Sequence, residues 1–499
     1  MAIEQQPFVL EDHLAILQVL VPLIAAPLCA LIKGGRWPWR IATLVSWLCL
    51  AISMKLVFMT LEKGVLSYAL GGWAPPWGIE YRVDVLNAFV LMVVSVIGAA
   101  VMSFARASVE KEVPGHKLGL FYAAYLLCLT GLLGITITGD AFNVFVFLEI
   151  SSLSSYALIA MGENRRCLIA SYRYLIIGTI GATFILIGIG LLYMMTGTLN
   201  MADLAQLLPE VERDRSVAYA FILIGVCLKL ALYPFHFWLP NAYAYAPSAV
   251  TAFLAGTATK VSLYVLLRFF FTIFGTNFSF GVMELNQLLL ILSTFAFLIT
   301  SFIAIFQVNV KRILAYSSLA QIGYMTLGIG LLSVTGLTAG LLHVFNHAIM
   351  KAALFMALGC IVYRTGATRL EHMHGVGKLM PWSMAAFVIG GLSLIGVPLT
   401  VGFISKWYLI LAAFEGGWGF LVVFILISSL MSVIYIWKVV EVAYFKPPAK
   451  PDVPWSEAPA GMLIPTWILI LANLYFGIHT DFTVGVAQRA AEWLIGGGL

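Results

Sequence analysis

The stretch LKLALYPFHFWLP at residues 228–240 places a lysine, Lys229, and a proline, Pro234, five residues apart in an apolar run. Proline removes one backbone hydrogen bond and its ring clashes with the preceding turn, so the run predicts a helix that is broken near Pro234. His236 lies in the same break. Two interpretations of His236 are equally open: a member of a proton relay, or a residue at a helix interface.

A second stretch, GLSLIGVPLTVGFISKW at 391–407, carries the same pair in reversed order, with Lys406 eight residues after Pro398. Broken helices at corresponding positions of two halves indicate inverted repeats around a transport path. The reversed order agrees with an inverted arrangement of the two stretches. Two ordinary proline kinks are the alternative explanation of this spacing.

The composition is typical of a membrane protein with many spans, not of a large globular core. Of 499 residues, 62% are hydrophobic and only 10% are charged, whereas a soluble domain carries roughly 25% charged residues. A span needs about 20 apolar residues. We therefore predict fourteen transmembrane segments, near 14–32, 40–60, 84–104, 118–138, 141–161, 172–195, 217–239, 247–270, 285–307, 314–333, 336–362, 383–413, 418–445 and 460–480.

Basic residues alternate between the predicted loops. One set of loops carries seventeen of them: Lys33, Arg36, Arg40, Arg106, Lys111, Lys117, Arg165, Arg166, Arg173, Lys311, Arg312, Arg364, Arg369, Lys378, Lys438, Lys446 and Lys450. The other set, with both termini, carries five: Lys63, Arg82, Arg213, Arg215 and Arg489. The positive-inside rule places the first set in the cytoplasm and both termini on the non-cytoplasmic side. The acidic N-terminal sequence predicts no cleavable signal peptide.

Ionisable residues in the middle of apolar runs carry most of the functional information. A charge near the bilayer centre costs at least about 2.5 kcal/mol, so such residues are kept mainly where they carry ions or pair with one another. Lysine can lose its proton when it is desolvated, whereas arginine stays charged, so buried lysines suit a switchable proton site. A static ion pair is the alternative. The set comprises Glu149, Lys229, Lys260, His343, His347, Lys351 and Lys406.

Glu149 lies about mid-span in the run AFNVFVFLEISSLSSYAL at 141–158. An unpaired carboxylate at that depth is neutral or costly. We expect Glu149 to pair with Lys229, which would make the protonation states of the two groups interdependent. The serines that follow favour close approach of helices over proton conduction; they are Ser151, Ser152, Ser154 and Ser155.

The segment HVFNHAIMK places His343, His347 and Lys351 at intervals of four residues. This spacing lines one helical face over two turns, and three ionisable groups on one stripe favour a proton relay. Two alternatives stay open. The histidine pair could bind a metal ion, although Lys351 would repel it and a further ligand is needed, or the stripe could serve polar helix packing.

The remaining features have simpler interpretations. Arg268, near a span end, is expected to snorkel to the interface, Asp84 to be interfacial, and Lys311 to anchor a span at the cytoplasmic boundary. No CxxC motif, Cys/His cluster or nucleotide-binding loop occurs, so we expect no metal, cofactor or nucleic-acid partner. The cysteines lie singly in apolar runs as small packing residues: Cys29, Cys49, Cys128, Cys167, Cys227 and Cys360.

Four motifs in order resemble a known family: FHFWLPNAY at 235–243, VKRILAYSSLAQIGYM at 310–325, HVFNHAIMKAALF at 343–355 and GVPLTVGFISKW at 396–407. They are similar to the antiporter-like subunits of respiratory complex I, membrane-bound hydrogenases and Mrp-type multisubunit sodium/proton antiporters. The resemblance extends over about residues 80–450. The chain length and the stretch GDAFNVFVFLEI look most like the D-type subunit of the Mrp antiporters.

The resemblance implies an all-α integral membrane fold of fourteen helices with two inverted five-helix repeats. The corresponding division of the single polytopic domain, 1–499, is N-terminal helices at 1–117, repeats at 118–270 and 285–445, and a C-terminal helix at 446–499. It also implies a proton-transfer axis, in which Glu149 pairs with Lys229, Lys260 bridges, His343, His347 and Lys351 form the central relay, and Lys406 is the terminal lysine.

The chain departs from the family pattern at two positions near the expected cytoplasmic entrance. Asn241 and Asn309 each stand where members of the family often carry aspartate. Each departure removes a carboxylate, which weakens an entrance role for these positions and leaves the central axis untouched.

The predicted function is ion transport rather than enzymatic catalysis. We expect a proton-translocating subunit of a monovalent cation (Na⁺ or K⁺)/proton antiporter, acting with sister membrane subunits in a bacterial or archaeal cytoplasmic membrane. A proton-pumping subunit of a redox complex, either an NADH:quinone oxidoreductase or a membrane-bound hydrogenase, would carry the same axis. A non-conducting scaffold is disfavoured, because a scaffold would gain stability from apolar residues at the buried charged positions.

Overall fold

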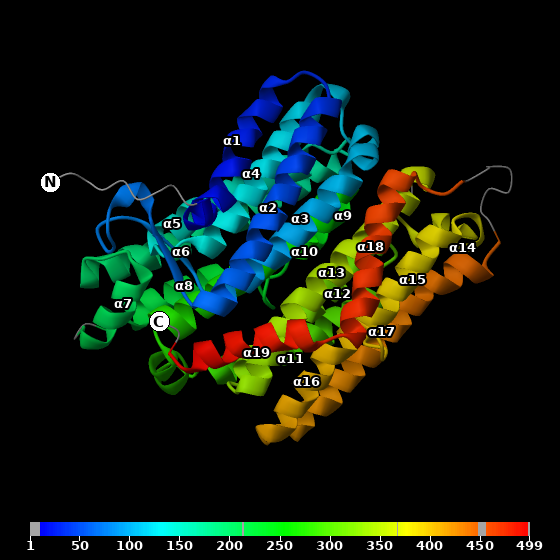
Figure 1. Cartoon of the computed structure of the whole chain (residues 1–499). Helices are drawn as coiled ribbons and strands as arrows, with labels where there is room; N and C mark the ends of the chain where they lie inside the picture. The colour runs from blue at the N-terminus through cyan, green and yellow to red at the C-terminus, as the bar shows by residue number, and fades with distance from the viewer. Residues whose placement is uncertain (1–9, 212–213, 367, 448–455, 498–499) are drawn as a thin grey trace.

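The chain folds into a bundle of long helices with one small β-hairpin (Figure 1). This computed structural model describes residues 10–211, 214–366, 368–447 and 456–497. The hairpin pairs β1 (Leu66–Ala69) with β2 (Glu80–Val83) in antiparallel register. The apolar pattern predicts only a loop here. Strands of four residues are too short to give a distinct hydropathy pattern between two long apolar segments.

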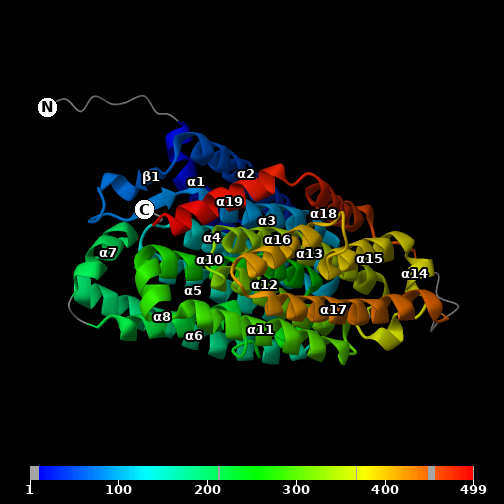
Figure 2. The ribbon, with the colours of Figure 1, turned by 90° about the horizontal axis from the view of Figure 1, so that it is seen from below.

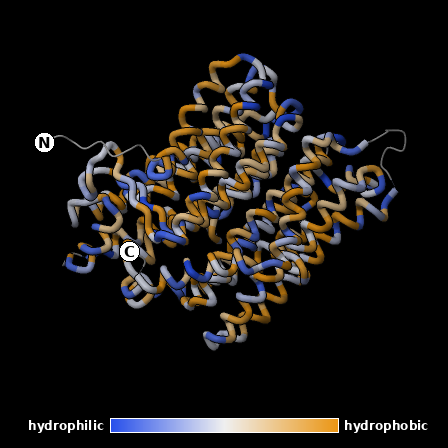
Figure 3. The backbone as a smooth tube through the Cα atoms, viewed as in Figure 1, coloured by the Kyte–Doolittle hydropathy of each residue, from blue (hydrophilic) through white to orange (hydrophobic). Residues whose placement is uncertain are grey.

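Eleven helices of the described residues are long and apolar enough to cross a membrane. Apolar residues occupy most of their length, and hydrophilic residues gather mainly in the connections (Figure 3). The chain is therefore a multi-pass integral membrane protein. The α-helical parts of these segments are α1 (Leu14–Leu31), α2 (Arg36–Lys63), α3 (Val85–Glu112), α4 (Leu118–Ile137), α5 (Ala141–Ala160), α6 (Arg166–Thr196), α10 (Ser248–Leu267), α11 (Leu285–Ile305), α13 (Val334–Thr365), α17 (Gly419–Phe445) and α18 (Ala460–Ile478).

Two of the predicted spans are each broken into two short helices. Pro234 lies in the gap between α8 and α9, and Pro398 lies in the gap between α15 and α16, so the predicted breaks are confirmed. The four helices are α8 (Ser216–Leu230), α9 (Leu239–Tyr245), α15 (Pro381–Ile395) and α16 (Val401–Glu415). A further helix, α12 (Val310–Gly330), crosses the bundle between α11 and α13.

The C-terminal region holds two helices, where the apolar runs predict one. After α18 the chain turns sharply into α19 (Asp481–Ile495), which lies against α13 and α3 (Figure 1). Val486, Ala490 and Leu494 are buried at intervals of four residues along it. Its apolar residues occupy one face only, so a search for continuous apolar runs does not detect it.

The bundle has two distinct ends, separated by the length of α3. This helix has 28 residues, which corresponds to about 42 Å. The hairpin end carries β1, β2 and a small cavity lined by Arg82, Asp84, Asn87, Thr138, Gly139, Met201, Ala202, Tyr264, Arg268 and Thr272. In Figure 2 this end, with α7 (Met201–Leu207), lies at the left of the bundle, and α14 (Val376–Leu379) lies at the right.

The opposite end, which we call the basic end, holds a cavity of about 440 Å³. Basic residues from the ends of three helices and from one connection line it: Lys111, Arg166, Lys311 and Arg369. Residues that the charge pattern assigns to one side of a membrane are thus neighbours in space. Arg213 and Lys450, which belong to the same charge pattern, lie outside the described residues.

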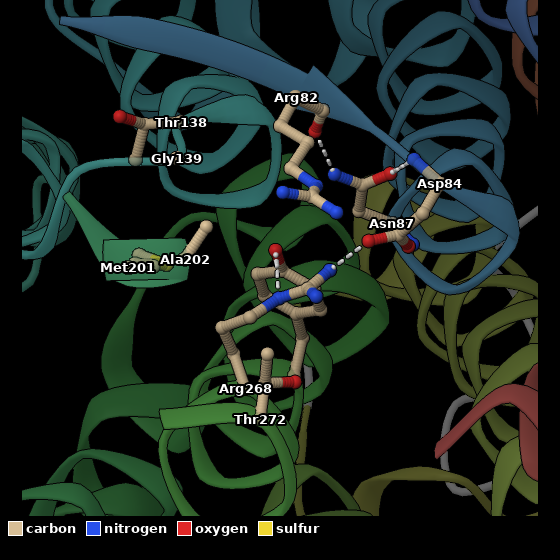
Figure 4. A pocket seen from close by; sticks show the side chains of 10 residues that line it. Arg82, Asp84, Asn87, Thr138, Gly139, Met201, Ala202, Arg268 and Thr272 are labelled. Carbon is tan, nitrogen blue, oxygen red and sulfur yellow. Dashed lines mark hydrogen bonds and ion pairs between the residues drawn. The ribbon is translucent and has the colours of Figure 1, made fainter. Parts of the chain in front are cut away.

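Arg268 does not snorkel to an interface, so that expectation was wrong; Asp84, at the N-terminal end of α3, is buried and paired with it. The Arg268 Nη2 atom lies 2.7 Å from Asp84 Oδ2, and the two side chains are only 6% and 1% exposed (Figure 4). Trp493 of α19 covers the guanidinium at 5.2 Å from its ring centroid. The hairpin end is closed by segments that are distant in sequence, and Asp84 supplies an internal partner that makes snorkelling unnecessary.

Lys311 is also more deeply buried than its predicted role as an interfacial anchor requires. Its side chain is 4% exposed, and Nζ donates a hydrogen bond of 2.9 Å to the carbonyl oxygen of Ala246. The lysine stands at the start of α12, as expected, but the connection between α9 and α10 folds over it.

Candidate functional site

The Lys229 ammonium contacts both a carboxylate and a hydroxyl of α5. Its Nζ atom lies 3.7 Å from Glu149 Oε1 and donates a hydrogen bond of 2.8 Å to Ser152 Oγ. The Lys229 side chain is 4% exposed, whereas that of Glu149 is 26% exposed. The pairing expected from the sequence is present in the structure, but the glutamate is less buried than expected and a serine is the closer partner.

The helix break next to Lys229 has its own stabilising contacts. α8 ends at Leu230, and Ala231 adopts a left-handed conformation with φ 57°. The Trp238 indole nitrogen donates a hydrogen bond of 3.0 Å to the carbonyl oxygen of Leu228, one of the carbonyls that a helix C-terminus leaves without a helical partner. The tryptophan therefore links the C-terminal end of α8 to the start of α9 beside the lysine.

His236 lies in this break but apart from the other candidate residues. It is 3% exposed, and its ring stacks on Tyr233 and Phe237, with centroids 5.2 and 4.6 Å away. Within the described ranges its Nδ1 atom has no hydrogen-bond partner, and no ion pair or hydrogen bond links it to Glu149 or the buried lysines. The aromatic contacts match the interface interpretation of this histidine.

Lys260 stands at the middle of α10 and is fully buried. Its Nζ atom donates a hydrogen bond to the Ala255 carbonyl of its own helix and lies 3.5 Å from Thr259 Oγ1. In the part of the chain that the structure describes it forms no ion pair. The static-pair alternative therefore does not account for Lys260.

The α13 stripe, whose four-residue spacing predicts a shared face, contacts α12 and α16. His343 binds at both ring nitrogens, with Nδ1 at 2.7 Å from Ser405 Oγ and Nε2 at 2.9 Å from Gln321 Oε1. Lys351 Nζ donates to the Leu314 carbonyl at 2.9 Å and to Ser317 Oγ at 2.5 Å. Each of these contacts joins α13 to a polar side chain or carbonyl of a neighbouring helix.

His347 lies between these two residues and differs from both. Its ring is parallel to that of His343, with centroids 6.0 Å apart, and it is fully buried. Neither of its nitrogens has a hydrogen-bond partner in the described residues. Buried polar groups normally have a partner in protein or ordered water, so this imidazole is available to water or to a mobile proton. No third His, Cys, Asp or Glu of the described residues joins the two histidines in a metal-binding group.

Lys406 reaches back from α16 to the end of α15. Its Nζ atom donates to the carbonyl oxygens of Leu394 and Ile395, at 3.2 and 2.8 Å, and to Ser429 Oγ at 3.0 Å. The last carbonyls of a helix carry partial negative charge and favour a cation. Gly396, with φ +91°, ends α15 beside the lysine. A Cβ atom at this position would lie 3.0 Å from Lys406 Cδ.

The lysines at the two helix breaks thus have different polar partners. Both ammonium groups lie at a helix break, but only Lys229 has a carboxylate partner in the described part of the chain, and Lys406 is held by carbonyls and a hydroxyl. The arrangement is therefore asymmetric in charge although it is similar in backbone form.

The candidate residues lie on helices that contact one another in sequence: α8 on α10, α10 on α13 and α13 on α16. Like charges on neighbouring helices repel one another, so simultaneous protonation of the whole set is disfavoured. We call this set the central row: Glu149, Lys229, Lys260, His343, His347, Lys351 and Lys406.

Several polar partners of the central row were not singled out from the sequence. Ser317, Gln321 and Tyr324 contact Lys351, His343 and Lys406 respectively. They lie at intervals of four and three residues, which places them on one face of α12. That spacing within the stretch AYSSLAQIGY is the sequence pattern from which these three partners could have been predicted.

The comparisons with known proteins agree on one family. Residues 138–432 match the family described as NADH:quinone oxidoreductase/Mrp antiporter, transmembrane. The chain is 41% identical to NADH-quinone oxidoreductase subunit N of Desulforudis audaxviator, over 96% of this chain and 99% of the relative. It is 33% identical to the Na(+)/H(+) antiporter D-type subunit of Alkalihalophilus pseudofirmus, over 81% of each chain.

Solved structures give the same result. The Mrp complex from Dietzia sp. DQ12-45-1b contains a chain that matches with a TM-score of 0.90 and 27% identity, covering 99% of this chain and all of that one. The membrane-bound sulfane sulfur reductase, an archaeal respiratory membrane complex, contains a chain that matches with a TM-score of 0.89 and 30% identity, covering 96% and 97%.

Proposed function

The chain belongs to the NADH:quinone oxidoreductase/Mrp antiporter transmembrane family, and we propose that it moves protons through the plane of the membrane along the central row. It is an antiporter-like membrane subunit of this family, whose members named above are parts of multisubunit membrane complexes. The row would serve as a series of proton-binding sites, each of which changes charge in turn.

The observation that carries the proposal is the distribution of acids along the row. Glu149 is its single carboxylate, and Lys260, Lys351 and Lys406 form no ion pair in the described residues. A buried ammonium without a counter-ion favours release of its proton. Glu149 therefore stabilises a proton on Lys229, and weakening of that stabilisation would make the proton available for transfer to the interior lysines.

Transfer along the row would follow from charge repulsion between neighbours. When Lys260 gains the proton that Lys229 gives up, its positive charge disfavours a proton on His347 and Lys351 of the adjacent helix α13. The next proton then moves outward to His343 and Lys406. Each step exchanges one proton between a protonated donor and a neutral acceptor, so charge is conserved and no cofactor is required.

For the topology, we propose fourteen membrane crossings with the basic end in the cytoplasm. The eleven long helices would be joined by α12 and by two broken helices, α8 with α9 and α15 with α16. The clustered basic residues support this orientation, because cytoplasmic connections carry an excess of lysine and arginine. The repeats would comprise 118–270 and 285–445, with both termini on the non-cytoplasmic side.

Two assignments of the whole complex are supported by different relatives. The first is a cation/proton antiporter in which this chain moves protons and the complex exchanges Na⁺ or K⁺; the similarity to the D-type subunits of Na(+)/H(+) antiporters supports it. The second is a redox-driven proton pump. The 41% identity to a protein named NADH-quinone oxidoreductase subunit N supports that assignment.

Transport by the purified whole complex in proteoliposomes tests both levels of the proposal. An imposed Na⁺ or K⁺ gradient drives a pH change if the complex is an antiporter, whereas electron donor and quinone drive it if the complex is a redox pump. In either case Lys229→Ala should abolish the proton movement. Lys55→Ala is the control, because Lys55 is exposed and its single ion-pair partner among the described residues is Glu11. Full transport by the Lys229→Ala complex would contradict proton movement along the central row and favour a non-conducting scaffold role for the chain.

A further inference from the structure

The four serines of α5 do not have the same role. Ser151, Ser154 and Ser155 each donate a hydrogen bond of 2.7–2.9 Å to a carbonyl of their own helix. Ser152 instead accepts the 2.8 Å hydrogen bond from Lys229 Nζ. Helix packing therefore explains three members of this stripe, and the fourth belongs to the environment of the central row.

Tyr156 continues the face of α5 that carries Glu149 and Ser152. Positions 149, 152 and 156 are three and four residues apart, which aligns them on one side of the helix. Because α5 runs from Asp140 at the hairpin end toward the basic end, Tyr156 lies about 10 Å nearer the basic end than Glu149. Ser152 and Glu149 are polar groups near its phenol.

The Tyr156 hydroxyl occupies a space that α6 leaves open for it. A Cβ atom at Gly178 would lie 1.9 Å from Tyr156 Oη, so any larger residue at 178 would displace the hydroxyl. The ring is held edge-on against Tyr174, with centroids 4.7 Å apart. Both contacts come from one side of α6 and orient the phenol toward that helix.

This hydroxyl is buried without a direct partner. Tyr156 is 4% exposed, and in the described ranges Oη has no hydrogen-bond partner. A buried unsatisfied hydroxyl costs roughly 1–3 kcal/mol, which phenylalanine would avoid while filling the same space. Packing alone therefore does not account for a tyrosine at this position, and a group that exchanges protons does.

A pocket at the basic end lies close to the backbone of Tyr156. A pocket of about 210 Å³ opens there, lined by Arg166, Ile169, Ala170, Arg173, Asn241 and Tyr245. The next residue after Ala170, Ser171, donates a hydrogen bond of 2.7 Å to the Tyr156 carbonyl oxygen. The turn of α6 that forms the pocket wall is thus the turn that contacts Tyr156.

We propose that Tyr156 and Ser152 form a side branch that carries protons between the pocket at the basic end and Lys229. This inference rests on the proposed function, because it gives the central row its supply of protons. Tyr156 Oη accepts a proton from water and releases its own, through a bridging water, to Ser152 Oγ, because the two hydroxyls form no direct hydrogen bond in the described residues. Ser152 in turn releases its proton to the neutral Lys229 amine. Each hydroxyl ends with one proton, and the net change is one proton moved from water to Lys229.

The test uses the whole complex in proteoliposomes with four variants of α5. Ser152→Ala and Tyr156→Phe should each lower proton flux by roughly tenfold, less than the hundredfold typical of a lost acid–base group, because water bypasses part of the branch. Ser151→Ala and Ser154→Ala remove a hydroxyl from neighbouring positions whose hydrogen bonds, among the residues described, go to carbonyls of their own helix. They should retain the wild-type flux.

Two measurements separate proton supply from a structural effect. If proton supply through the side branch becomes rate-limiting in Tyr156→Phe, its flux should depend more steeply on the pH at the basic end. The solvent deuterium isotope effect on the flux should also rise. Ser152→Thr, which keeps the hydroxyl, should restore the flux lost in Ser152→Ala. Gly178→Ala displaces the Tyr156 hydroxyl from another helix and should reproduce the Tyr156→Phe pH profile.

The outcomes distinguish the branch from the row. Wild-type flux and pH profile in Ser152→Ala and Tyr156→Phe, together with loss of flux in Lys229→Ala, would overturn the branch and leave the proposed function intact. Reduced flux with an unchanged pH profile and isotope effect would also overturn it, because the tyrosine would then be structural. Full flux in Lys229→Ala would remove the proposed function itself.

Discussion

Lys229 and Glu149 form an ion pair in which the Nζ and Oε1 atoms lie 3.7 Å apart. A charge-assisted hydrogen bond is shorter, at about 2.8 Å, and Lys229 makes a contact of that length to Ser152 instead. The carboxylate therefore attracts the ammonium without holding it tightly. A loose pair of this kind suits a site that must lose its proton during each cycle.

Glu149→Gln should test this pair directly. The substitution keeps the size of the side chain and removes its charge, so a proton on Lys229 is no longer stabilised and proton flux should fall by roughly a hundredfold. Cation-driven pH change in vesicles and Na⁺ or Li⁺ tolerance of antiporter-deficient cells measure it. Glu415→Gln, at the exposed end of α16, is the matched control. Unchanged tolerance in Glu149→Gln would contradict a role for the pair.

Gly396→Ala should disturb Lys406 through the backbone. The added Cβ would lie 3.0 Å from Lys406 Cδ, and the residue would keep φ +91°, which costs a non-glycine residue about 1–2 kcal/mol. Gly34→Ala introduces similar strain at φ +88° with no atom within 4 Å of the new Cβ. Both variants should lose thermal stability, but only Gly396→Ala should lose proton flux. Equal proton flux in the two variants would show that the position of the Lys406 side chain does not affect transport.

Gln321→Leu should impair His343. Gln321 Oε1 lies 2.9 Å from His343 Nε2, and its removal leaves a buried nitrogen without a partner, at a cost of about 1–3 kcal/mol. The tautomer of His343 would no longer be defined, so flux should fall together with stability. Gln307→Leu is the comparison, because Gln307, just beyond the end of α11, donates to the carbonyl oxygen of Ile303 and has no bond to a residue of the central row in the described residues. Normal proton flux in a correctly assembled Gln321→Leu complex would contradict the idea that Gln321 fixes the His343 tautomer that transport needs.

Asp84→Asn should destabilise the fold while sparing the transport step. It leaves the buried Arg268 guanidinium without its counter-ion, which costs roughly 3–5 kcal/mol. The double variant Asp84→Asn with Arg268→Gln removes both charges and should recover part of the stability. Thermal unfolding of the purified complex measures both, and flux per assembled complex should stay normal. Reduced proton flux in a variant of unchanged stability would show that this ion pair takes part in transport.

Reporter fusions should test the orientation of the bundle. A reporter after residue 499 should give no cytoplasmic signal, whereas one inserted at Gly115, between α3 and α4, should give one. The reason is the excess of basic residues at that end. A cytoplasmic signal from the C-terminal fusion would contradict the fourteen proposed crossings.

Much of the architecture follows from local sequence. Apolar runs of about 20 residues specify membrane helices because each residue transfers to lipid nearly independently of the rest of the fold. Pro234 and Pro398 mark the two breaks because proline disrupts a helix through its own ring. The α13 stripe likewise follows from helical periodicity. The candidates Glu149, Lys229, Lys260, His343, His347, Lys351 and Lys406 could therefore be named from the sequence alone.

The sequence by itself determined a multi-pass helical membrane protein with buried ionisable residues and two broken helices. Only the tertiary structure decided which groups meet. Arg268 finds Asp84 across 184 residues, Lys229 reaches Ser152 across 77 residues, and Lys311 is covered by the connection before α10. Such contacts depend on how helices pack against one another. The free energy of a buried charge depends on its neighbours, which local hydropathy does not encode.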